Sequence, residues 1–179
     1  MKGPGIFLAQ FAGNEAPFDS LEGMAQWAAG LGYVGEQVPT SDPGLFDLAL
    51  AAKSQDYCDD VRGKLARYGI AITELSTHLQ GQLLACHPAY ADAFRGFAAP
   101  EVRDDASKWP AWATSELKHA ARASARLGLK AHATFSGALL WHMVYPWPQR
   151  PPGLVEAGFA ELARRWRPVL DAFAEVDVA

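Results

Sequence analysis

Three helix-to-strand junctions in this chain share one local form: an apolar helix end, a glycine, and then a strand-like run. Glycine is the usual helix terminator, because it adopts the left-handed backbone conformation without steric cost. Each junction therefore marks the step from a helix to the strand that follows it. The three glycines are Gly32, Gly69 and Gly128.

The segments around these junctions alternate between two hydrophobic patterns. Short apolar runs predict strands, and apolar residues spaced three and four apart predict amphipathic helices. The predicted strands are residues 5–11, 34–38, 70–77 and 129–135, and the predicted helices are residues 20–31, 58–68, 113–127 and 155–173. Pro168 removes a backbone donor within the fourth helix, which predicts a kink there or a break near Arg167. After it, Val176–Ala179 has the pattern of a fifth strand that has only begun.

Regular strand–helix alternation is typical of an α/β fold with a parallel sheet. Both the closed (β/α)8 TIM barrel and the open doubly wound sheet fit this pattern. The open dinucleotide-binding sheets carry a G-x-G-x-x-G turn after the first strand, whereas residues 11–15 here read Phe-Ala-Gly-Asn-Glu. A whole barrel needs about 250 residues. We therefore predict a partial TIM barrel, with four βα units and the start of a fifth strand. Residues 1–179 would form its amino-terminal half as one domain.

Composition narrows the classes of partner. Half of the residues are hydrophobic, which is enough for one well-packed core, and the net charge of −4 disfavours binding to nucleic acid. There is no apolar run long enough for a bilayer and no secretory signal pattern, so we expect a cytoplasmic location and no membrane partner. Cys58 and Cys86 have no metal-type spacing and are expected to be reduced thiols.

Function in such barrels collects at the carboxyl ends of the strands. Period-two alternation assigns one set of residues to the barrel interior, and Leu129, Ala131, Ala133 and Phe135 to the helix side. The interior set is Ile6, Leu8 and Gln10; Ile70, Ile72, Glu74, Ser76 and His78; and Lys130, His132, Thr134 and Ser136. Gln10, His78 and His132 would then converge at the barrel mouth. The alternative for each is a hydrogen-bonded interior residue that only fills space.

Two expected loops carry groups that suit a sugar. The loop at residues 78–88, which includes Gln80, is rich in neutral hydrogen-bonding groups and suits a polyhydroxylated ligand. Ser136 precedes an aromatic stretch that begins at Trp141, whose ring would either stack on a sugar or pin the loop to the body. The sequence has no nucleophile elbow, no H-E-x-x-H and no zinc-type cysteine pair.

Four segments carry a resemblance to a known family. They are residues 3–11 (GPGIFLAQF), 74–82 (ELSTHLQGQ), 132–137 (HATFSG) and 145–150 (YPWPQR). In these segments the chain resembles the sugar phosphate isomerase/epimerase branch of the xylose isomerase-like barrels, and the likeness runs along the whole chain.

The resemblance implies a metal-dependent enzyme that isomerises or epimerises a sugar or polyol through an enediolate-like proton transfer. The divalent metal (Mn, Mg, Co or Zn) would be held by two Glu, one Asp and one His from the second half of the barrel, so we place no metal ligand and no catalytic acid or base in this chain. The substrate-binding residues expected here are Gln10, His78, Gln80, His132, Thr134, Ser136 and Trp141.

His78 matches a histidine that family members often place at the end of the third strand, and His132 matches a polar position at the end of the fourth. Gln37, preceded by Glu36, stands where the superfamily commonly has a glutamate, which leaves a role for either residue in doubt. Glu175 stands in the region where a glycine is expected before the fifth strand.

Three hypotheses follow. In the first, the chain is half of a sugar isomerase or epimerase and is inactive alone. In the second, it is a self-associating half-barrel that binds a sugar without catalysis, because the outer strands would otherwise have bare edges. In the third, it resembles the apurinic endonucleases of the same superfamily. The net negative charge of the chain disfavours this third hypothesis.

Overall fold

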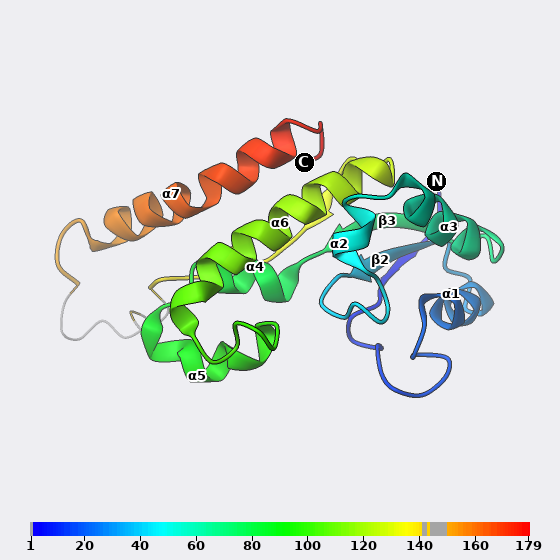
Figure 1. Cartoon of the computed structure of the whole chain (residues 1–179), viewed down its shortest axis with the longest axis horizontal. Helices are drawn as coiled ribbons and strands as arrows, with labels where there is room; N and C mark the ends of the chain where they lie inside the picture. Colours follow the sequence, from blue (N-terminus) through cyan, green and yellow to red (C-terminus); the bar gives the residue numbers. More distant parts are fainter. Residues whose placement is uncertain (1, 141–142, 144–149) are drawn as a thin grey trace.

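The computed structural model describes residues 2–140, 143 and 150–179 (Figure 1). Strands and helices alternate along the chain, as the sequence predicts. The strands are β1 (Gly5–Phe7), β2 (Gly35–Pro39), β3 (Ala71–Ser76) and β4 (His132–Ala133). The longer helices are α1 (Leu21–Gly30), α3 (Gln55–Ala66), α4 (His78–Leu84), α6 (Trp109–Arg126) and α7 (Leu154–Ala174), and the four-residue helices are α2 (Leu48–Ala51) and α5 (Ala91–Phe94). None of the described helices is long and apolar enough to cross a membrane.

The order of the strands decides between the two architectures. All of the pairs are parallel, and the order in space is β1-β2-β3-β4, the same as along the chain. A doubly wound sheet reverses its order at a switch point, whereas a barrel adds each new strand on the same side. The sheet is therefore the wall of a partial barrel, which confirms the predicted fold class.

The three junction glycines all adopt the left-handed conformation, with φ of 88° at Gly32 and 74° at both Gly69 and Gly128. Each lies between the end of a helix and the next strand, so the repeated motif has the predicted meaning.

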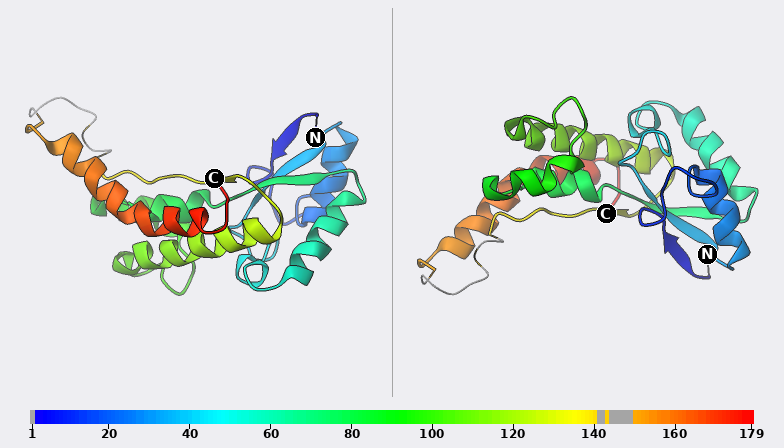
Figure 2. Two further views of the ribbon diagram at one scale, coloured as in Figure 1. Left: turned by 90° about the horizontal axis from the view of Figure 1, so that it is seen from above. Right: turned by 90° about the horizontal axis from the view of Figure 1, so that it is seen from below.

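One face of the sheet packs against helices and forms the hydrophobic core. Val38 of β2 and Leu75 of β3 are paired neighbours and fully buried. Met24 of α1, Leu65 of α3 and Leu117 of α6 belong to the same buried cluster. Helix α7 lies beside α6, and the two extend away from the sheet (Figures 1 and 2). We call this side of the sheet the core face and the opposite side the open face.

A bulge in β3 changes the alternation. Glu36 of β2 is opposite Ile72, but the next residue, Gln37, is opposite Glu74, so Thr73 is an extra residue in β3. A bulge of this kind moves every later side chain to the other face. Glu74 therefore lies on the open face with Gln37, and the prediction that Ile72 and Glu74 share a face is wrong.

The segment after β3 is a helix and not the expected loop. Helix α4 begins at His78, and its residues Leu83 and Leu84 are buried in the core cluster. Gly81 brings α4 very close to the chain after β4: a Cβ there would lie 2.1 Å from Thr134 Oγ1 and 2.2 Å from Phe135 O. The apolar spacing of Leu79, Leu83 and Leu84 was the helical signal in the sequence.

Two further predictions differ from the structure. Strand β4 is only His132–Ala133, shorter than the predicted 129–135, because the residues that follow it run beside α4 instead of in the ladder. Helix α7 is one helix through Pro168, so of the two predicted outcomes, a kink at Pro168 or a break near Arg167, the break is excluded. Val169 and Phe173, just beyond the proline, are buried and hold the last turns in place.

The last residue extends the sheet. Ala179 N donates to Lys130 O at 2.9 Å, and His132 N donates to Ala179 O at 2.8 Å. Together these two bonds make the pattern of a parallel strand pair centred on Ala131. The start of a fifth strand is therefore present beside β4. It is shorter than predicted, because Asp177 is in a left-handed turn with φ of 56°.

Candidate functional site

His78 lies at the carboxyl end of β3, on the open face, between two aromatic rings. Its imidazole stacks on Phe7 of β1, with ring centroids 5.3 Å apart, and meets Phe135 edge-on at 4.3 Å. Phe135 follows β4, so the three rings come from three different strand ends. Aromatic contacts of this kind fix the plane of the histidine ring.

A polar pair lies on the same face. Gln37 Nε2 donates to Glu74 Oε1 at 2.5 Å, and the register places these two residues opposite each other on β2 and β3. The amide holds the carboxylate in one orientation. Glu74 is also close enough to His78 to act on its charge. Gln37, Glu74 and His78, with Phe7 and Phe135, form one cluster, which we call the open-face cluster.

Burial lowers the pKa of His78, and the negative charge of Glu74 offsets part of this effect. Its Nδ1 atom is buried and has no hydrogen-bond partner among the described residues. Both observations favour a neutral imidazole at neutral pH, because a buried, unpartnered ring nitrogen is costly to protonate.

His132 does not lie at the mouth, and its predicted placement is wrong. Its ring packs against Phe173 of α7 at 5.1 Å on the core face. Nε2 is 2.8 Å from Thr77 Oγ1, and Nδ1 is 3.3 Å from Ser124 Oγ of α6. Burial lowers the pKa of His132 to about 4. Because His132 is opposite Leu75 in the ladder, it shares the face of Leu75 and joins the sheet to α6 and α7.

Gln80 is buried within α4 and tied to the end of β2. Its Nε2 donates to Thr40 O at 3.1 Å and lies 3.3 Å from Thr40 Oγ1. Its Oε1 and the Nε2 of Gln82 are buried, with no partner among the described residues. The structure thus gives Gln80 a bond between two elements, not a position in an exposed loop.

The remaining predicted residues are scattered. Gln10 lies in an exposed turn after β1, and the interior placement of Leu8 is wrong, because Leu8 is fully buried in the core. Thr134 Oγ1 donates to Thr77 O at 3.0 Å, and Ser136 Oγ donates to the neighbouring Gly137 O at 2.9 Å. Trp141 lies outside the described residues. Of the six predicted residues that the structure describes, His78 alone lies in the open-face cluster.

Glu36 is a buried carboxyl group without a partner. It is fully buried beside Ile6 and Ile72, and neither carboxylate oxygen has a hydrogen-bond partner among the described residues. Burial raises its pKa to about 7. Its neighbour Gln37 points to the opposite face, as period-two geometry requires, so the two residues have separate roles.

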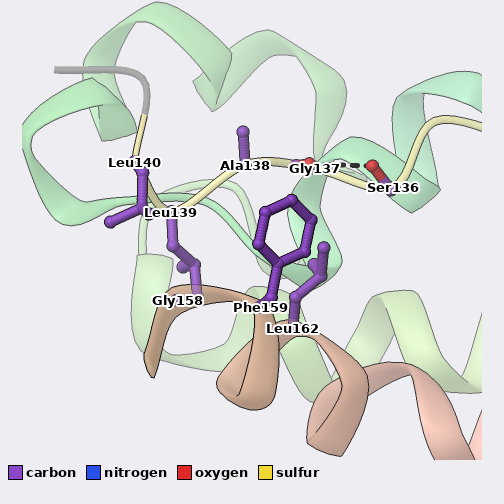
Figure 3. A pocket seen from close by; sticks show the side chains of 8 residues that line it. All are labelled: Ser136, Gly137, Ala138, Leu139, Leu140, Gly158, Phe159 and Leu162. Carbon is purple, nitrogen blue, oxygen red and sulfur yellow. Dashed lines mark hydrogen bonds between the residues drawn. The ribbon is translucent and has the colours of Figure 1, made fainter. Parts of the chain in front are cut away.

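A shallow apolar hollow lies beyond β4. It has a volume of about 310 Å³ and lies between residues 136–140 and α7. Figure 3 shows Phe159 and Leu162 pointing from α7 toward this segment, while the Ser136 hydroxyl is turned to Gly137. Phe159 is 66% exposed. The lining offers a sugar almost no hydrogen bonds, and it suits an apolar protein segment better.

The described residues do not supply a metal site. No three His, Cys, Asp or Glu side chains in that part of the chain gather closely enough to hold an ion. The metal expected from the family resemblance therefore has no ligand set among them.

The sequence reasoning missed four members of the open-face cluster as candidates: Phe7, Gln37, Glu74 and Phe135. The assignment of side chains to faces by period-two alternation was wrong in β1 and β4, because these strands are only three and two residues long. Phe7 and Phe135 therefore face the mouth, although Phe135 was assigned to the helices. The signal available for Glu74 was its place four residues before His78.

Comparisons with known proteins support the partial barrel. No protein-family model matches the chain, and no curated protein matches it. Among solved structures, a xylose isomerase domain protein from Planctomyces limnophilus aligns with a TM-score of 0.53 and 16% identity, over 98% of this chain and 51% of its own. A D-psicose 3-epimerase, solved in the presence of D-fructose, aligns with a TM-score of 0.48 and 12% identity, over 99% of this chain and 50% of its own. The chain thus spans about half the length of both structures. The first alignment shows a shared fold.

Proposed function

We propose, from the half-barrel fold that it shares with a xylose isomerase domain protein, that this chain forms the sugar-binding wall of a sugar isomerase or epimerase. The observation that carries the proposal is the open-face cluster. It places a histidine, a carboxylate and an amide between two aromatic rings at the carboxyl ends of parallel strands, where barrel enzymes bind their substrates.

Each member of the cluster has a task in this proposal. Phe7 and Phe135 present apolar surface to the C–H groups of a sugar and hold the His78 ring in one plane. The buried Nδ1 leaves Nε2 of His78 as the nitrogen that a sugar hydroxyl can reach. Glu74, oriented by Gln37, accepts a bond from a second hydroxyl. Binding two hydroxyls at fixed positions orients the reacting carbon, which is a large part of catalysis.

The acid, the base and the divalent metal of the reaction are proposed to come from outside the described residues, and the 179-residue chain alone is proposed to be inactive. In a full-length protein that contains this chain, we expect turnover of a sugar to stop with a chelator and to return with manganese or magnesium. The measurement is the rate of isomer or epimer formation before and after the metal is restored. Undiminished turnover after exhaustive chelation would refute metal dependence.

A second candidate is a half-barrel that pairs with its own copy and binds a sugar without catalysis. The exposed apolar side chains of α7 favour it, because Phe159 and Leu170 are 66% and 59% exposed. Here Phe159→Lys is expected to shift the chain from dimer to monomer in sedimentation velocity. Leu31→Lys, at an equally exposed leucine after α1, is the matched control and should leave the dimer intact. A monomeric wild-type chain at all concentrations would exclude this candidate.

A further inference from the structure

The barrel-mouth end of the sheet is acidic. The segments that lead from each strand to the next helix carry four carboxylates, and Glu74 adds a fifth at β3. The same segments contain one basic residue, Arg150. The four carboxylates are Glu15, Asp19, Asp42 and Asp47. This excess of acidic over basic residues is a property of the sequence, so it holds for every conformation of these segments.

The basic residues lie elsewhere. All 16 lysines and arginines fall outside the four strands and outside α4. Many of them pair with acids on helices or on the surface loops between them, as in Arg62–Asp59, Arg95–Asp104 and Arg164–Glu161. In the described part of the chain, the one charge that acts on His78 is Glu74, and the hydrogen-bond partner of Glu74 is the neutral amide of Gln37. The open-face cluster contains no Lys or Arg, so no basic side chain of the cluster would compensate the charge of a phosphate placed there.

We propose that the open-face cluster binds the uncharged, hydroxyl-bearing part of a sugar and rejects a phosphate at that position, with Glu74 as the residue that discriminates. This inference rests on the proposed function and narrows its substrate class. It concerns the part of the substrate next to His78, since phosphate sites in barrels are often built by loops after the seventh and eighth strands.

Glu74 is suited both to binding sugar hydroxyls and to repelling a phosphate. A carboxylate held by Gln37 has lone pairs left for sugar hydroxyls, and the rings of Phe7 and Phe135 pack against the His78 ring and offer apolar surface beside it. A phosphate monoester carries a charge of about −1.5 to −2 at neutral pH. Repulsion between it and a half-buried carboxylate several ångströms away corresponds to a loss of about tenfold in affinity.

The test uses the whole 179-residue chain, with the ring C–H signal of His78 followed by NMR. The two probes are D-fructose and D-fructose 6-phosphate. We expect free fructose to shift the His78 signal with a dissociation constant about tenfold lower than that of the phosphate. In Glu74→Gln the two constants should agree within about twofold, because the carboxylate charge is gone. Glu101→Gln removes one exposed acid far along the chain from the cluster and should leave the wild-type ratio unchanged.

The outcomes of this experiment distinguish a failure of the role proposed for Glu74 from a failure of the proposed sugar-binding wall. Equal or tighter binding of the phosphate to the wild type, or discrimination that survives in Glu74→Gln, would overturn the role of Glu74 while leaving a sugar site in place. If neither probe shifts the His78 signal of the folded chain, the sugar-binding wall itself is refuted.

Discussion

Gly81→Ala is expected to destabilise the chain by about 2 to 3 kcal/mol, although alanine is the better helix former. The new methyl group would lie 2.2 Å from the backbone oxygen of Phe135. A backbone atom cannot turn away as a side chain can, so α4 and the chain after β4 would have to separate. That movement would also displace Phe135 from the His78 ring. Chemical denaturation measures the loss of stability, and the His78 ring signal reports the change in the cluster.

Gly63→Ala is the matched control. Gly63 is also inside a helix, α3, but a Cβ there meets nothing within 4 Å. It should stabilise the chain by up to about 1 kcal/mol, since only the helix propensity changes. Equal effects at the two glycines would show that α4 does not approach β4 as closely as described.

Glu36→Gln is expected to stabilise the chain by about 3 kcal/mol above neutral pH and to have little effect in mild acid. Burial raises the pKa of Glu36 from 4.5 to about 7 in the folded chain. Between these values the folded state keeps a proton that the unfolded state loses, so stability falls as pH rises. A tenfold change in a protonation equilibrium corresponds to about 1.4 kcal/mol. Glutamine has the same shape and no charge, so it removes this cost.

His132 adds an opposite slope to the plot of unfolding free energy against pH, because its pKa is lowered from 6.5 to about 4. The neutral His132 ring contributes its full share to the free energy of unfolding above the pKa that it has in the unfolded chain. This contribution is lost as the pH falls toward 4. In the wild type, His132 makes the unfolding free energy rise with pH in mild acid, whereas Glu36 makes it fall. The two effects nearly cancel there. Glu36→Gln should therefore change a nearly flat profile into one that rises with pH up to the unfolded pKa of His132.

The measurement is the free energy of unfolding from urea titrations between about pH 4.5 and about pH 8. Glu175→Gln, which neutralises an exposed acid at the end of α7, serves as the control and should follow the wild-type profile. Parallel profiles for Glu36→Gln and the wild type would show that Glu36 is not a buried, uncompensated carboxyl.

How far the sequence was predictive depends on the length of each element. Helix α1 begins and ends within a residue of the predicted range, because ten residues carry a full apolar stripe and Gly32 terminates the pattern. The face of His132 was wrong, because β4 is two residues long and too short for its alternation to be read. At β3 the interior placement of Glu74 was right and that of Ile72 was wrong, because the extra residue Thr73 shifts the alternation and periodicity does not reveal it.

The sequence by itself determined the repeating units, the left-handed glycines between them and therefore the partial barrel. These follow from local preferences: apolar spacing and backbone conformation act over a few residues. Only the tertiary structure decided which side chains meet at the mouth. His78 met Phe7, Phe135 and Glu74, while His132 turned to the helices. Except for Glu74, those partners are distant in sequence, and they are selected by strand register and by the close approach at Gly81, which are properties of the packed sheet.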